Sequence, residues 1–181
     1  MGSGRCLVLA ATLAAAPTAA LAEVVAQARE GFIVAHDVIL DAAPERAFAA
    51  LTEEVSGWWD AGHSYSGEAG NFTLDARAGG CFCERLANGG SVEHMRVVFS
   101  SPGAMLRMEG GLGPLQGIGA SGTMTFTFSP EGDATRLAFR YSVSGFVPDG
   151  LASMAEPVDR VLGGQLARLA AHLAGETSLP R

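Results

Sequence analysis

The sequence predicts an α+β helix-grip fold, in which a curved antiparallel β-sheet wraps around a long C-terminal α-helix. The segment Leu151–Ala174 carries apolar residues at the i, i+3, i+4 and i+7 spacing of one buried helix face. Residues 71–143 contain short runs with alternating apolar and polar residues, separated by turn residues. Because the long amphipathic helix comes last, we expect the preceding strands to form the sheet that it covers.

Length and composition restrict the class of protein. A chain of 181 residues is long enough for one domain with a hydrophobic core. Apolar residues make up 48% and charged residues 17%, which is typical of a globular chain. The formal net charge of −7 argues against nucleic acid or an anionic membrane surface as a partner, because both require a basic surface.

Residues 1–22 have the pattern of a signal peptide. Arg5 supplies the positive charge, Leu7–Ala16 is a short apolar run, and Ala20-Leu21-Ala22 is a small-residue cleavage site before Glu23. The apolar run is about half the length that spans a bilayer. An N-terminal core helix is the alternative. We therefore expect a periplasmic or secreted protein with no stable membrane insertion after cleavage.

The mature chain divides into three expected parts. Residues 23–30 are expected to be a linker or a helical lead-in, residues 31–175 the folded domain, and residues 176–181 a C-terminal tail. Within the domain, Gly31–Leu40 alternates as a strand does, with apolar residues on both faces. Pro44 is then placed to begin a helix, whose expected buried face comprises Ala47, Phe48, Leu51 and Val55.

Short strands and turns follow. The expected strands are Asn71–Arg77, Cys81–Leu86, Ser91–Phe99, Ala104–Glu109, Ala120–Phe128 and Thr135–Val143. The last two alternate strictly between apolar and polar residues, which indicates an antiparallel sheet covered on one face only. The glycine-rich segment Gly110–Gly119 is expected to form a flexible lid or rim over a cavity mouth.

The closing helix contains a local weakness. Ser153-Met-Ala-Glu156 resembles a capping box, which favours a start near this point. Gly163-Gly164 then lies in mid-helix, where each glycine costs about 1 kcal/mol relative to alanine. Two explanations remain open: close packing against Trp58-Trp59, or space kept for a ligand.

Several motifs together resemble a known superfamily. They are Asp41-Ala-Ala-Pro-Glu-Arg-Ala-Phe48, Gly57-Trp-Trp59, Gly79-Gly-Cys-Phe-Cys-Glu-Arg85, the Asn88-Gly turn, Arg96-Val-Val and Val158-Asp-Arg-Val-Leu-Gly-Gly-Gln-Leu166. In this order they resemble the SRPBCC superfamily, and most of all the group of the activator of Hsp90 ATPase homologue and the polyketide cyclase-like proteins. The resemblance covers about residues 31–174.

The resemblance implies a helix-grip fold with an internal cavity, as in START and Bet v 1-like proteins. Its members include lipid and hormone carriers, polyketide cyclases and co-chaperones, and they share no catalytic motif, so no catalytic residue is carried over. The chain departs from its relatives at Cys81 and Cys83, where those proteins more often have arginine or an aromatic residue. The export signal is also unusual for the group.

Cys81 and Cys83 lie two residues apart on an expected strand, so both side chains point to the same face. A disulfide between them closes a small ring that is strained in an extended strand, so we expect buried free thiols. A disulfide pair is one alternative. The other is a metal half-site with His94, which a two-residue turn at Asn88-Gly89 places opposite Cys83, whereas a three-residue turn moves His94 to the other face.

Two residues are candidates for proton transfer. His63 lies in the loop after Trp59, where a general acid or base at a cavity mouth is one interpretation and an exposed loop histidine the other. Glu93 shares strand parity with Met95 and Val97, and so is the best inward-facing acid among the charged strand residues, which also include Glu84, Arg107 and Arg140. Because Glu93 lies near a turn, we expect it to be exposed to solvent, and an inward-facing acid is the alternative.

We therefore expect a protein that binds a small apolar or amphipathic molecule in a cavity between the sheet and the last helix. The expected lining is Trp58, Trp59, Met95, Phe126, Phe139, Met154 and Leu162. One alternative is an enzyme of the polyketide cyclase/dehydratase kind that uses His63 or Glu93 for proton transfer. Another is a co-chaperone-like interaction module. The sequence indicates no cofactor and no metal.

Overall fold

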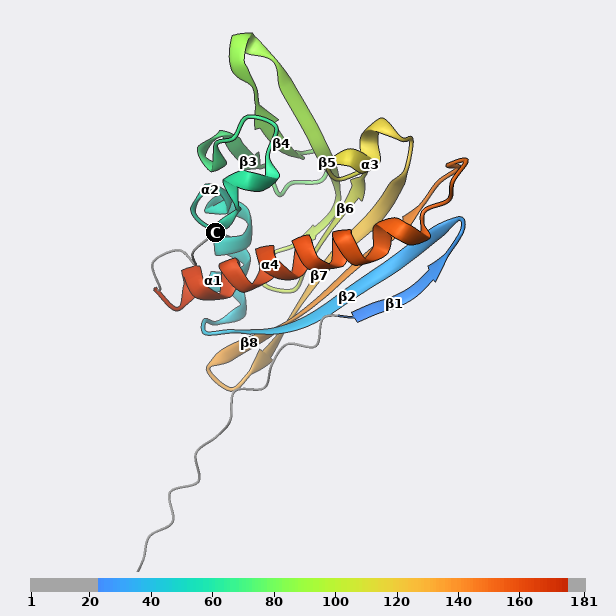
Figure 1. Ribbon diagram of the computed structural model, residues 1–181. Helices are drawn as coiled ribbons and strands as arrows, with labels where there is room; N and C mark the ends of the chain where they lie inside the picture. Colours follow the sequence, from blue (N-terminus) through green and yellow to red (C-terminus); the bar gives the residue numbers. More distant parts are fainter. Residues whose placement is uncertain (1–22, 176–181) are drawn as a thin grey trace, which may run out of the picture.

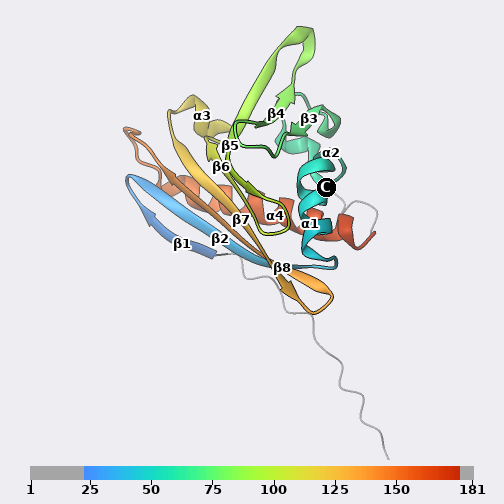
Figure 2. The ribbon, with the colours of Figure 1, turned by 180° about the vertical axis from the view of Figure 1, so that it is seen from behind.

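An eight-stranded antiparallel sheet curves around the C-terminal helix α4 (Ala155–Leu173), which crosses one face of the sheet (Figure 1). The computed structural model describes residues 23–175. The helix-grip fold class predicted from the sequence is confirmed, and Figure 2 shows the sheet from the face that α4 does not cover. The expected signal peptide 1–22 and tail 176–181 lie outside the described residues.

The strands follow one another around the sheet in the order β1-β2-β8-β7-β6-β5-β4-β3. Their bounds are β1 Glu23–Ala28, β2 Gly31–Leu40, β3 Phe72–Leu74, β4 Cys81–Arg85, β5 Ser91–Ser101, β6 Met105–Gly110, β7 Ser121–Glu131 and β8 Ala134–Ser144.

The prediction of a linker or helical lead-in over residues 23–30 is wrong. These residues form β1, which pairs antiparallel with β2 and forms one edge of the sheet. Both faces of β2 are fairly apolar, as the sequence indicated, and β2 lies between β1 and β8. The backbone hydrogen bonds of an interior strand such as β2 require a partner on each side, and β1 provides the second one.

The helices are short apart from α1 and α4. The helices other than α4 are α1 Pro44–Glu53, α2 Val55–Trp58 and α3 Pro114–Gly117. Single 3-10 turns lie at Ala61–His63, Ala69–Asn71, Ala87–Gly89 and Ala152–Met154. The expected loop over residues 110–119 therefore contains one helical turn. No helix in residues 23–175 is long and apolar enough to cross a membrane.

The core lies between the sheet and α4. Alternation in β7 and β8 sets the buried face as predicted: Met124, Phe126, Phe128, Leu137, Phe139, Tyr141 and Val143 are buried. The matching polar face includes Arg136 and Arg140, which are exposed. Leu162, Leu166 and Leu169 of α4 complete the core from the helix side.

Two β-bulges interrupt the alternation of β5. One lies where the pairing passes from Phe82↔Met95 to Cys83↔Glu93, and it leaves His94 as the extra residue. A bulge places two consecutive residues on one face, and both His94 and Met95 are buried. The parity expected for β5 from its sequence therefore changes at His94.

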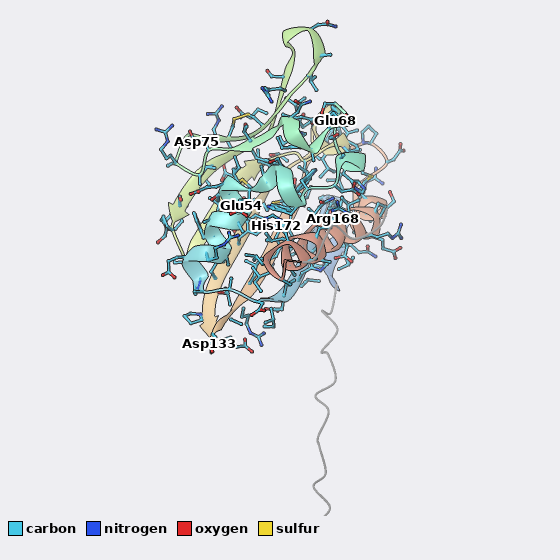
Figure 3. All side chains as sticks on the ribbon, turned by 90° about the vertical axis from the view of Figure 1, so that its left-hand side faces the viewer. Glu54, Glu68, Asp75, Asp133, Arg168 and His172 are labelled. Carbon is cyan, nitrogen blue, oxygen red and sulfur yellow. A yellow bond between two sulfur atoms is a disulfide. The ribbon has the colours of Figure 1, made fainter. Side chains whose placement is uncertain are left out.

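The glycine pair of α4 has a different neighbour from the one expected. A Cβ at Gly163 would lie 2.8 Å from Cε1 of His36 in β2, whereas a Cβ at Gly164 meets no atom within 4 Å. Gly163 thus allows close packing against β2 and not against Trp58-Trp59. Farther along α4, Nε2 of His172 lies 2.6 Å from Oε2 of Glu54, a contact between α4 and the α1–α2 junction that Figure 3 labels.

Candidate functional site

A pocket of about 370 Å³ lies beside the N-terminal half of α4. The rest of the wall comes from the α2–β3, β6–β7 and β8–α4 connections and from His94 of β5. The lining residues are Trp59, Gly62, His63, Ser64, Tyr65, His94, Leu112, Gly113, Pro114, Leu115, Met154, Pro157, Val158, Val161 and Leu162. Most of these side chains are apolar, so the pocket suits a largely apolar molecule.

The helix contributes a stripe that begins before its first turn. Val158, Val161 and Leu162 follow the i, i+3, i+4 spacing and share one face of α4. Met154 lies in the 3-10 turn that leads into the helix. Farther along, Leu166 and Leu169 pack into the core instead. The single apolar stripe read from the sequence therefore has two uses: pocket wall at one end and core at the other.

The connection between β6 and β7 forms the rim opposite α4. Leu112–Leu115 line the pocket, and buried Tyr141 of β8 fixes the start of this segment. The Tyr141 hydroxyl donates to the carbonyl of Gly110 at 2.9 Å and accepts from the backbone N–H of Leu112 at 3.2 Å. Burial raises the pKa of Tyr141 to about 12, with the Leu112 N–H opposing, so the hydroxyl keeps its proton at neutral pH.

The loop after α2 forms the other side of the mouth. Nε1 of Trp59 donates to the carbonyl of His63 at 3.0 Å, and the backbone N–H of Asp60 donates to Oε1 of buried Gln165 at 2.9 Å. Nδ1 of His63 lies 3.3 Å from Oδ2 of Asp60. The N–H of Gly62 lowers the pKa of Asp60, burial opposes this, and the charges of Arg168 and His63 add to the lowering.

A hydrogen bond joins the two loops at the pocket mouth. The hydroxyl of Tyr65, whose side chain is largely exposed, donates to the carbonyl of Gly113 at 3.1 Å. The Tyr65 ring also stacks on the imidazole of His94, with ring centroids 5.9 Å apart. Tyr65 therefore touches both the rim and the one buried histidine of the pocket wall.

This histidine forms a buried hydrogen-bonded pair with Glu84. Nε2 of His94 is 3.0 Å from Oε2 of Glu84 in β4, and the two residues are only 3% and 1% exposed. The same carboxylate accepts from the backbone N–H groups of Tyr65 at 3.1 Å and Ser66 at 2.6 Å. Glu84 thus links β4 to β5 and to the loop that contains Tyr65 and Ser66.

Burial and hydrogen bonding set the charges of this pair. Burial acts to raise the pKa of Glu84, but hydrogen bonds from Ser66, Tyr65 and His94 outweigh it and hold the pKa below its usual value. Burial lowers the pKa of His94, and the neighbouring Glu84 offsets only part of that shift. At neutral pH the pair is therefore a carboxylate and a neutral imidazole.

The residues expected to line the cavity divide into two groups. Trp59, Met154 and Leu162 lie on the pocket wall, together with His63. The others, Trp58, Met95, Phe126 and Phe139, are buried in the core and do not reach the wall. The indole of Trp58 points back to α1, where its Nε1 donates to the carbonyl of Ala50 at 3.0 Å.

Of the two orientations open for Glu93, the structure has the solvent-exposed one. Because His94 is the extra residue of the bulge, Glu93 lies on the outer face, where it is exposed and forms an ion pair with Arg96. The inward acid is Glu84, on the neighbouring strand. Glu84 and Phe82 are buried and Cys83 between them is partially exposed, which is ordinary strand alternation. The sequence therefore contained the pattern that turns Glu84 inward.

The expectation of free thiols is also wrong, because Cys81 and Cys83 form a disulfide. Their Cα atoms are 5.4 Å apart, less than the roughly 6.6 Å spanned by two residues of a regular strand. The strand is therefore shortened locally to a separation that a disulfide bridges. Cys83 pairs with Glu93 and not with His94. Within residues 23–175, the one group with three close potential metal ligands is Cys81, Cys83 and Glu93, and its sulfurs are bonded to each other.

Comparison with known proteins agrees with this architecture. The chain belongs to the polyketide cyclase / dehydrase and lipid transport family, whose model matches residues 32–174. This confirms the SRPBCC resemblance. No curated protein sequence matches the chain.

Solved structures share the fold at low sequence identity. A protein from Rhizobium leguminosarum is 21% identical with a TM-score of 0.60, and the match covers 88% of this chain and 100% of that one. CalU16 from Micromonospora echinospora is 16% identical with a TM-score of 0.58, covering 89% and 88%. Protein MLL2253 from Mesorhizobium loti is 20% identical with a TM-score of 0.56, covering 81% and 99%.

Proposed function

We propose that this protein binds a small hydrophobic or amphipathic molecule in the pocket between α4 and the two loops at its mouth. The observation that carries the proposal is the pocket itself: about 370 Å³, with mostly apolar walls. This volume falls in the range of roughly 300–1,000 Å³ typical of small-molecule sites. Apolar ligand surface removed from water contributes about 25 cal/mol per Å², so burial supplies most of the binding free energy.

The direct test fills the pocket from α4. Val161 lines the pocket, and Val161→Phe adds a ring to the space that a ligand would occupy. The matched control is Val98→Phe on β5, because Val98 is exposed and lies away from the pocket. Binding is measured by titration with 2-methoxynaphthalene, an uncharged apolar probe, and by native mass spectrometry of the protein as purified.

We expect Val161→Phe to weaken probe binding by tenfold or more and Val98→Phe to leave it unchanged. Co-purified ligand should be retained by the wild type and by Val98→Phe and lost from Val161→Phe. Equal binding by the two variants would contradict the proposal, since it would place the probe outside the pocket.

A second candidate is a cyclase-like enzyme that moves a proton at the pocket wall. The observation that favours it is the Glu84–His94 pair, in which a carboxylate orients a neutral imidazole. His63 lies at the mouth, while Glu93 is on the outer face and takes no part. The test is the exchange of the central C–H hydrogens of 1-phenyl-1,3-butanedione with deuterium from D₂O. Catalysed exchange that falls to background in His94→Asn supports the enzyme, and background exchange in the wild type rejects it.

We also propose that the protein is exported and acts in the periplasm or outside the cell. The pattern of residues 1–22 supports this, as does the Cys81–Cys83 disulfide, since disulfides persist in oxidising compartments. β1 begins at Glu23, so cleavage after Ala22 would leave every described strand and helix intact. The N-terminal sequence of protein from a periplasmic fraction should begin at Glu23, whereas an intact Met1 would contradict export by this signal. The co-chaperone-like role stays a prediction.

A further inference from the structure

We propose that the ligand of this pocket carries a hydroxyl group on an apolar skeleton, a phenol or an alcohol, and that its O–H donates a hydrogen bond to Nδ1 of His94. The inference rests on the proposed ligand-binding function and specifies the ligand class. It follows from the hydrogen-bond inventory of the Glu84–His94 pair.

The contact with Glu84 fixes the proton of the His94 ring on Nε2. The Glu84 carboxylate, which also receives the N–H groups of Tyr65 and Ser66, has only acceptor atoms when ionised. An imidazole nitrogen 3.0 Å from this carboxylate must therefore carry a hydrogen. Because the ring is neutral, the other nitrogen, Nδ1, has a lone pair and no proton.

Nδ1 of His94 is the atom that the ligand would contact. This atom is buried and has no hydrogen-bond partner among residues 23–175. The ring is held in place by aromatic contacts with Tyr65, Phe72 and Phe82, with centroid distances of 5.9, 5.3 and 5.3 Å. It is therefore not free to turn toward another partner. A buried acceptor without a donor is unfavourable, and a donor from a molecule in the pocket would satisfy it.

The rest of the pocket wall is mostly apolar. The other imidazole on the wall, that of His63, lies at the mouth, and its Nδ1 faces Asp60. The hydroxyls of Ser64 and Tyr65 already donate to the carbonyls of Ala61 and Gly113. Val158, Val161, Leu162 and Leu115 offer only apolar contact. A ligand would thus place one polar group at His94 and its apolar part along α4.

This arrangement also predicts which ligands are rejected. A methyl ether has no hydrogen to donate to Nδ1. A carboxylate brings another acceptor toward that lone pair, and it adds a second negative charge near a pair in which Glu84 already carries one. Hydroxylated apolar molecules should therefore bind more tightly than their ethers and their carboxylate analogues.

The experiment compares 2-naphthol, 2-methoxynaphthalene and 2-naphthoate by titration with wild-type protein and His94→Phe. We expect the wild type to prefer 2-naphthol by about tenfold over 2-methoxynaphthalene, a free-energy difference of about 1.4 kcal/mol, and to bind 2-naphthoate most weakly. In His94→Phe the preference for the naphthol should disappear. Equal affinity of the wild type for 2-naphthol and its ether would overturn the inference but leave the proposed function intact, whereas failure to bind any of the three would contradict the proposed function itself.

A second measurement needs no variant. Imidazole 15N resonances of the wild type report which nitrogen carries the proton. We expect His94 to be protonated on Nε2 alone, and we expect its Nδ1 resonance to shift with 2-naphthol but not with 2-methoxynaphthalene. A proton on Nδ1 in the free protein, or an Nδ1 resonance that both probes leave unchanged, would show that His94 is not the acceptor.

Discussion

Gly163 of α4 lies directly against His36 of β2, so that a Cβ at position 163 would come within 2.8 Å of Cε1 of the imidazole. His36 is itself buried, and its Nε2 lies 2.9 Å from Oδ1 of Asp159 on the same helix. Close packing of α4 on β2 at this point therefore depends on a residue without a side chain.

The two glycines of α4 should respond in opposite ways to alanine. Gly164→Ala should raise the free energy of unfolding by about 1 kcal/mol, because Gly164 is exposed, has open space for a Cβ, and gains helix propensity. Gly163→Ala should be less stable than Gly164→Ala by about 1–3 kcal/mol, since its methyl group would displace His36. Denaturant unfolding of both variants measures the difference. Equal stability would mean that His36 yields to the methyl group at no cost.

Stability should fall as the pH is lowered below about 6.5. Burial lowers the pKa of His94 from its ordinary 6.5 in the folded state, so the unfolded chain takes up this proton first as the pH falls. The pKa of Glu84 is also lowered in the folded state, so stability falls further as the pH drops toward the pKa of Glu84. The titratable groups that face His94 are Glu84 from β4 and the Tyr65 phenol from the loop, and His63 lies on the same pocket wall.

The measurement is the change in unfolding free energy between about pH 7.5 and about pH 5.5. We expect His94→Phe to lose much of this change, while the control His63→Ala retains it, because His63 is 44% exposed in its side chain. A change of the same size in His94→Phe and wild type would show that other groups govern the pH dependence.

Removing the disulfide should cost stability but not binding. A bond between Cys81 and Cys83 closes a very short loop, for which chain entropy gives a stabilisation of about 1.6 kcal/mol, below the usual 2–4 kcal/mol. The double variant Cys81→Ser/Cys83→Ser should lose about this amount in denaturant unfolding. Wild type treated with a thiol reductant serves as the chemical control and should show the same loss.

Probe affinity should be unchanged in that double variant, because the inward residues of β4 are Phe82 and Glu84. An affinity loss as large as that of Val161→Phe would contradict this separation of the disulfide from the pocket.

Loosening the pocket mouth should speed ligand release. Tyr65→Phe removes the hydrogen bond to the carbonyl of Gly113 that joins the two loops and keeps the ring that stacks on His94. Since Tyr65 is 55% exposed, the free energy of unfolding should change by less than about 1 kcal/mol. Stopped-flow measurement should show a several-fold faster dissociation of 2-methoxynaphthalene. An unchanged dissociation rate would mean that this contact does not hold the mouth closed.

Local patterns in the sequence were enough to predict the architecture. The hairpin of β7 and β8, the start of α1 at Pro44 and the apolar stripe of α4 all follow from side-chain periods of 2.0 and 3.6 residues, which depend only on neighbouring residues. The helical period also placed Met154 and Leu162 on the stripe that reaches the pocket wall, whereas Trp59 and His63 were expected near the cavity from the loop in which they lie.

Other residues could not be assigned in this way. Gln165 falls on the polar side of α4 by helical period, yet it is buried, because the Asp60 loop folds over it and the backbone N–H of Asp60 donates to its Oε1. Likewise, β1 carries no strong strand pattern of its own, and its conformation depends on the free edge of β2.

Local hydrophobic periodicity was therefore sufficient to predict the fold class, the succession of strands from β2 to β8 and the helix that covers the sheet, because each of these depends on neighbouring residues alone. The tertiary structure alone decided that a bulge turns His94 inward and Glu93 outward, that Glu84 meets His94, and that Gly163 packs on His36. Each of these depends on the register between strands or on contacts between distant segments. A shift of one residue reverses the face of every side chain that follows, and no local pattern records it.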